Sequence, residues 1–304
     1  MIRFILFWFL FLSSIMLPAY AGIAPNVVVS IKPIHSLVAG LMQGVGKPGL
    51  LLKGFDSPHT YQLKPGDAKL LANADLVVWV GFELEGFLQR PIRQLADKAV
   101  IITLLDVPGM TILSSRSAKH GHATHRHDDH RFLTRDPHLW LDSSNAIHIV
   151  NSVRDRLIKL DPSNEKIYTN NATKMLSSLQ SLEQEVINAV KPVRHLRMIA
   201  FHDTWQYLEK RFGLNIVRHV ISDPGRVPGT RQVAMLDSLF ENKGVDCLLT
   251  EPQFKPHFLQ NLLREHPVTV ITLDPLGSGI QAGVDAYVKL IRQIGQDLQQ
   301  CLPR

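Results

Sequence analysis

Short apolar runs alternate with longer stretches of helical periodicity along most of the chain. Several runs are rich in Val, Ile and Leu on both faces, which is typical of parallel strands covered by helices. We expect strands at residues 27–31, 50–52, 76–80, 100–104, 198–201, 216–221, 245–250 and 268–273. Helical patterns lie between them, as in residues 67–74, 230–242 and 284–300. This alternation predicts an α/β fold with parallel-type sheets.

One helical stretch is too long for a simple crossover between strands. Asp161 can cap its start, Pro162 suits its first position, and Pro192 ends it. A rod from residue 162 to 190 would span about 43 Å at 1.5 Å per residue. Its apolar stripe consists of Met175, Leu176, Leu179, Leu182, Val186 and Val190. We therefore expect two α/β lobes, residues 22–160 and 193–304, joined by a rigid connector helix at residues 161–192.

The N-terminus has a different character. Arg3 is its only charge, residues 4–16 are almost wholly apolar, and Ala19-Tyr20-Ala21 forms a cleavage pattern. These features predict a secretory signal peptide at residues 1–21, because the apolar run is short for a membrane span. An uncleaved anchor is the alternative. No other stretch of the sequence is apolar enough to span a bilayer, so we expect an exported, soluble protein without stable membrane insertion.

Composition fits a folded protein of more than one domain. The chain has 304 residues, of which 45% are hydrophobic and 20% are charged, so it can form a sizeable core. The net charge of +6 comes from scattered residues, with no Lys/Arg block interleaved with aromatics. We therefore expect a solvated basic surface and no nucleic-acid partner.

Cys247 and Cys301 are the only cysteines. An even pair in an exported protein suggests a disulfide, which would close a long loop and stabilise the fold by roughly 4 kcal/mol. Two free buried thiols are the alternative.

A histidine-rich segment interrupts the α/β pattern. Residues 114–136 are almost free of apolar side chains, which predicts a mobile surface loop. It contains His120, His122, His125, His127 and His130. The letters THRHDDH match the HxHxDH pattern of metallo-β-lactamase-type hydrolases, but the preceding SSRSAKHGHA cannot form the buried strand that such a catalytic site requires. The loop is thus either a solvated spacer or a low-affinity metal collector.

Isolated polar residues follow the expected strands, where ligands bind in open α/β sheets, or lie just beyond the polar loop. These are His59, His138, His202, Glu251 and Asp274. Three imidazoles with one carboxylate or water suit Zn²⁺, whereas Mn²⁺ prefers more oxygen ligands. We expect the remaining histidines to be structural hydrogen-bonding residues and not metal ligands. They are His35, His148, His195, His219, His257 and His266.

Specific motifs also carry a family resemblance. They are SIKPIHSLVAGLMQGVG, SPHTYQLKPGDAKLLANADLVVWVG, DPHLWLD, FHDTWQYLEKRFGL, EPQF and TLDPLG. Through them the chain resembles the periplasmic zinc-binding components of bacterial zinc ABC importers (ZnuA type), in the cluster of metal-binding receptors. The resemblance implies two lobes, a long helix, metal in the cleft between the lobes and a Cys247–Cys301 disulfide. It also implies a membrane permease as partner, and we expect a periplasmic monomer that is no enzyme.

The resemblance further implies the ligands. His59, His138 and His202 match the three histidine ligands, and a histidine at position 202 favours zinc over manganese. Asp274 matches a carboxylate that ligates in manganese members. Some zinc members carry a glutamate where this chain has Pro58, so the fourth ligand is either Asp274 or water. A manganese receptor or metal-dependent adhesin on the same fold is the nearer alternative function, and a secreted zinc hydrolase is the remote one.

Overall fold

The structure is a computed structural model that describes residues 24–116, 135–221, 229–241, 244–254, 259 and 263–303. The expected signal peptide (1–21) lies outside these residues, as do His120, His122, His125, His127, His130 and His257. Within the described part, none of the helices is both long and apolar enough to cross a membrane.

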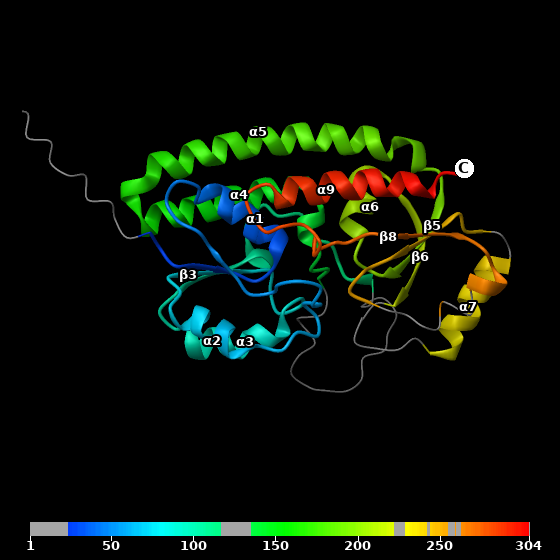
Figure 1. Ribbon diagram of the computed structural model, residues 1–304, viewed down its shortest axis with the longest axis horizontal. Helices are drawn as coiled ribbons and strands as arrows, with labels where there is room; N and C mark the ends of the chain where they lie inside the picture. The colour runs from blue at the N-terminus through cyan, green and yellow to red at the C-terminus, as the bar shows by residue number, and fades with distance from the viewer. Residues whose placement is uncertain are drawn as a thin grey trace, which may run out of the picture.

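Two four-stranded parallel sheets form the two lobes, as predicted (Figure 1). The N-terminal sheet has the order β2-β1-β3-β4, formed by Gly49–Leu50, Val27–Val29, Leu76–Trp79 and Val100–Thr103. The C-terminal sheet has the order β6-β5-β7-β8, formed by Asn215–Ile221, Arg197–His202, Cys247–Thr250 and Thr269–Thr272. Strands β1 and β3 are buried throughout, which explains their lack of apolar–polar alternation.

Helices cover both sheets. They are α1 (Lys32–Leu41), α2 (Pro65–Ala72), α3 (Gln89–Leu95), α6 (Gln206–Phe212) and α7 (Thr230–Glu241). Helix α1 follows β1 closely, and a proline in its first turn suits the start of a helix. Its residues Ile34, Leu37, Val38 and Leu41 recur at helical spacing and are buried in the core.

The long helix is present and spans both lobes in Figure 1. It is α5 (Glu165–Val190), whose 26 residues measure about 39 Å. It starts later than predicted because residues 162–164 form the 3₁₀ turn η5 (Pro162–Asn164), where the Asp161 carboxylate accepts hydrogen bonds from Ser163 and Asn164. The turn η6 (Lys191–Val193) follows α5. Helix α4 (Ser143–Leu160) packs against α5.

The C-terminal helix α9 (Ala286–Asp297) adds a second link between the lobes. It packs against both α5 and α1 and runs beside α5 in Figure 1. The Lys32 ammonium, at the start of α1, donates to the carbonyl oxygens of Gly277, Ser278 and Ile280 at 2.7–2.8 Å. The connector is therefore a layer of helices and not one isolated rod. The exact lobe boundaries, at residues 160 and 192, stay a prediction.

The predicted disulfide is formed between Cys247 and Cys301, whose Cα atoms are 5.5 Å apart. It ties the turn η7 (Leu298–Cys301), which follows α9, to the first residue of β7. Both cysteines are buried, so the bond fixes the end of the helical layer to the C-terminal sheet.

Candidate metal centre

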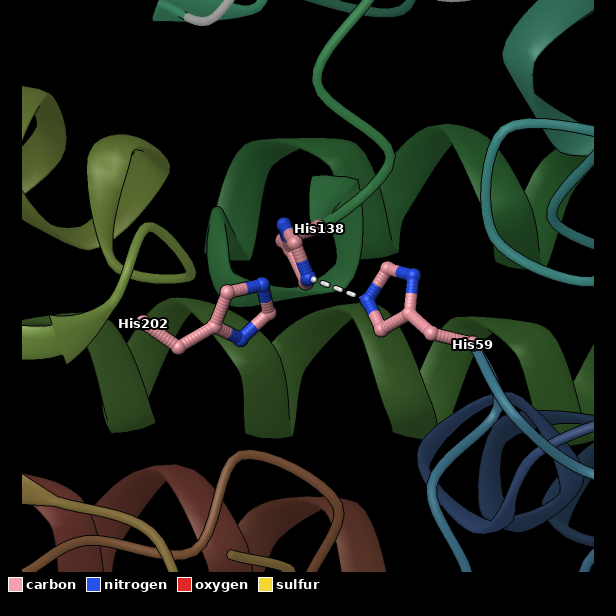
Figure 2. A group of neighbouring side chains, drawn as sticks. All are labelled: His59, His138 and His202. Carbon is pink, nitrogen blue, oxygen red and sulfur yellow. Dashed lines mark hydrogen bonds between the residues drawn. The ribbon is translucent and has the colours of Figure 1, made fainter. Parts of the chain in front are cut away.

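Three histidines from distant parts of the chain meet between the lobes (Figure 2). His59 lies in the loop between β2 and α2, His138 precedes the turn η4 (Leu139–Leu141), and His202 is the last residue of β5. Their ring centroids form a near-equilateral triangle with sides of 5.1–5.5 Å. The structure thus brings together the three histidines that the sequence analysis selected.

The spacing of the nitrogens suits one small metal ion. The Nε2 atoms of His59 and His138 are 3.4 Å apart. Two nitrogens at about 2.0–2.1 Å from a tetrahedral Zn²⁺ would be separated by about 3.3 Å. The ligand atoms of all three histidines lie within 4.8 Å of one another, so a modest adjustment of the rings would place every nitrogen at bonding distance.

Asp136 fixes the tautomer of His138. Its Oδ1 is 2.8 Å from His138 Nδ1 and also accepts from the His138 backbone N–H. Since an ionised carboxylate only accepts, Nδ1 carries the proton and Nε2 presents a lone pair. Gln206 donates to the other Asp136 oxygen, and Tyr207 donates to its carbonyl, which together hold Asp136 in place.

Thr204 and Glu251 orient His202. The Thr204 hydroxyl donates to Glu251 Oε1 at 3.0 Å, so its oxygen is left to accept from His202 Nδ1–H. His202 Nε2 is then free for a metal. His202 ends β5 and Glu251 follows the neighbouring strand β7, which is the point where the strand order reverses and where open α/β sheets bind ligands.

The environment keeps His59 neutral. Burial lowers its pKa well below the ordinary value, and the neighbouring His202 and His138 lower it further. A neutral imidazole is the form that binds metal. In the metal-free protein His59 Nε2–H can donate to His138 Nε2, and this proton must leave Nε2 when a metal takes its place.

The structure does not bring Asp274 into the group of three histidines. Its Oδ1 accepts from Gln253 Nε2 at 2.7 Å and from the Leu276 backbone N–H at 3.0 Å. Its Oδ2 accepts from the backbone N–H of Ser278. Both oxygens are therefore engaged within the protein.

The cavity beside the histidines is small. It measures about 20 Å³ and is lined by all three histidines together with Glu251, Gln253 and Trp140. That is room for one ion or water molecule, whereas pockets for drug-sized molecules span roughly 300–1,000 Å³. The THRHDDH segment lies outside the described residues, so the interpretation of its hydrolase pattern stays a prediction from the sequence.

Other histidines have different surroundings. Buried His35 contacts the Pro48 carbonyl oxygen through Nε2. His266 bonds Asp237 and stacks on Phe240, and with Glu241 it forms a second cluster of possible ligand atoms on the surface.

Sequence reasoning missed Asp136 and Thr204, which bond the Nδ1 atoms of His138 and His202. Asp136 stands two positions before His138, and Thr204 two positions after His202. Short polar side chains at such local spacing commonly bond a neighbouring group, so this signal was available. No local sequence pattern indicated the hydrogen bond between Gln253 and Asp274, because it joins two separate loops.

Comparisons with known proteins identify the family and the fold. The sequence matches the family described as zinc-uptake complex component A, periplasmic (ZnuA), over residues 27–301. A high-affinity zinc uptake system protein ZnuA from Brucella abortus (strain 2308) is 34% identical over 328 residues, covering 97% of this chain and 98% of that protein.

Two solved structures share the fold. The periplasmic zinc-binding protein TroA from Treponema pallidum has a TM-score of 0.75 at 20% identity, covering 92% of this chain and 99% of that one. The substrate-binding protein FpvC from Pseudomonas aeruginosa, in complex with Mn²⁺, has a TM-score of 0.76 at 22% identity, covering 91% and 98%. With the family match extending across nearly all of the described residues, the chain belongs to the ZnuA family of periplasmic zinc-uptake components.

Proposed function

We propose that this protein captures Zn²⁺ in the periplasm and delivers it to the membrane permease of an ABC importer. The observation that carries the proposal is the 3.4 Å separation of His59 Nε2 and His138 Nε2, with His202 completing the triangle. Family membership supports the same function. His59, His138 and His202 are the proposed ligands.

Capture requires no covalent chemistry in the protein. The ion loses most of its water and gains three neutral imidazoles, which are already gathered and, for His138 and His202, already oriented. This pre-organisation strengthens binding because little side-chain freedom remains to be lost. Release then requires a shift of one ligand loop. His59, which lies in a loop between β2 and α2, is the ligand we expect to move.

Manganese is the alternative cargo, because FpvC shares the fold and is described in complex with Mn²⁺. A nitrogen-rich cluster favours Zn²⁺ over Mn²⁺. The test is the metal content of protein purified from medium with equal zinc and manganese. We expect about one zinc per chain and little manganese, whereas mainly manganese would overturn the zinc assignment.

We further propose that His120, His122, His125, His127 and His130 form a weak accessory collector. Five imidazoles in one polar segment can bind several ions loosely. Deleting residues 119–130 should remove weak zinc equivalents in calorimetric titration and leave one tight site. Loss of the tight site as well would show that the segment supplies a primary ligand.

A further inference from the structure

Gln253 lines the cavity beside the three histidines, and the two ends of its side-chain amide differ in their hydrogen bonds. Its Nε2 donates to Asp274 Oδ1 at 2.7 Å and to Ser278 Oγ at 2.9 Å. Its Oε1 is buried and has no hydrogen-bond partner among the residues that the structure describes. A buried carbonyl oxygen without a donor is costly, so this atom marks a place where a donor is expected.

The orientation of the Gln253 amide is fixed by Asp274. Turning the amide over would set Oε1 against the Asp274 carboxylate, where two acceptors repel each other. The nitrogen must therefore face Asp274, and the oxygen must face elsewhere. In the part of the chain that the structure describes, no protein group donates a hydrogen bond to Oε1.

The same contact restrains Asp274. Gln253, the Leu276 N–H and the Ser278 N–H together hold both carboxylate oxygens. These bonds fix the carboxylate where it stands, outside the group of possible metal ligands, so it would have to shift against them to join the three histidines. Without Asp274 the histidine cluster offers three nitrogens and an open fourth position, which is the arrangement that suits zinc.

We propose that Gln253 sets the metal preference of the site: Nε2 holds Asp274 away from the ion, while Oε1 accepts a hydrogen bond from the water molecule that completes the zinc coordination. Metal-bound water is a strong donor because the ion withdraws electron density from it. The acceptor stabilises the zinc-type site, and the restrained carboxylate withholds the extra oxygen that manganese prefers. This inference rests on the proposed function.

The first test is Gln253→Leu in the mature protein, which removes both polar atoms at similar size. Zinc and manganese affinities are measured by competition with a chelating indicator. We expect zinc binding to weaken and manganese binding to strengthen, so that the ratio of the two affinities falls at least tenfold. A ratio within twofold of wild type would overturn the proposal.

The second variant combines Gln253→Leu with Asp274→Asn. It lacks the freed carboxylate, so the gain in manganese affinity should disappear while zinc binding stays weakened. A manganese gain that persists in the double variant would show that Asp274 is not the restrained group. Thermal unfolding of both variants checks that they fold.

A crystal structure of the zinc-loaded wild-type protein provides the structural readout, because it distinguishes a water oxygen from an Asp274 oxygen beside the ion. We expect three imidazoles and one water oxygen, and an Asp274 oxygen bound to zinc would overturn the inference alone. A wild-type protein without tight zinc binding would instead refute the proposed function, and the inference would fall with it. The two failures are therefore distinguishable.

Discussion

Single hydrogen-bond partners decide which ring nitrogen of His138 and of His202 carries the proton. Asp136 accepts a hydrogen bond from His138 Nδ1–H, and Thr204 Oγ1 accepts one from His202 Nδ1–H, so each imidazole presents Nε2 to the cavity. Glu85 is a contrasting case. It is fully buried, accepts from Ser30 Oγ and the Gly81 N–H, and burial raises its pKa to about 7 in spite of these bonds.

The raised pKa of Glu85 predicts a pH dependence of stability. The folded protein holds this proton up to about pH 7, whereas an ordinary carboxyl loses it near 4.5. Ionisation therefore destabilises the fold, and the free energy of unfolding should fall by up to roughly 3 kcal/mol as pH rises from 4.5 to 7. Urea unfolding of metal-free wild type and Glu85→Gln measures the difference. An identical pH slope in both would contradict the assignment.

At the scale of elements, the two sheets share one strand order but use it differently. In the C-terminal sheet, the reversal between β5 and β7 carries His202 and Glu251. In the N-terminal sheet, the corresponding reversal lies between β1 and β3. There the Glu85 carboxylate accepts hydrogen bonds from Ser30, which follows β1, and from the N–H groups of Val80 and Gly81, which follow β3. The N-terminal lobe contributes its histidines from loops instead.

Lys32 joins the start of α1 to the loop behind the cavity. Lys32→Met removes three charge-assisted hydrogen bonds and leaves three carbonyl groups without their donor. We expect the free energy of unfolding to fall by roughly 3 kcal/mol. Denaturant unfolding checks this, with the exposed Lys47→Met as the matched control. A loss equal to that of the control would show that the three hydrogen bonds of Lys32 do not stabilise the fold.

The elements were largely predictable from the sequence, and the contacts between them were not. Buried strands such as β3 follow from runs of apolar residues, and His202 was selected because it follows the predicted strand at residues 198–201. Asp274 also follows a strand, but the sequence could not show that Gln253 and Ser278 bond its carboxylate. Pairings between distant loops depend on how the lobes are packed, which local pattern does not encode.

At the scale of the whole molecule, the lobes are held by two adjacent helices (Figure 1). Helices α5 and α9 pack along each other, and α1 packs against both. Hinge closure requires a few residues that absorb a large backbone rotation, and this helical layer resists such a rotation. We therefore expect the metal to enter and leave through loop movement.

Small-angle X-ray scattering tests this rigidity. Metal-free and zinc-loaded protein should give superimposable curves, with radii of gyration that agree within about 0.5 Å. A clear contraction on zinc binding would show that the lobes close around the ion and that the helical layer bends.

The central claim is that His59, His138 and His202 together hold one tight zinc ion. Competition titration with a chelating indicator tests it most directly, using His59→Ala, His138→Ala and His202→Ala, with the exposed His195→Ala as control. Each of the three should weaken the tight site at least a hundredfold, since each removes one of the proposed ligands, while the control keeps wild-type affinity. Undiminished affinity in any two of the three variants would contradict the account.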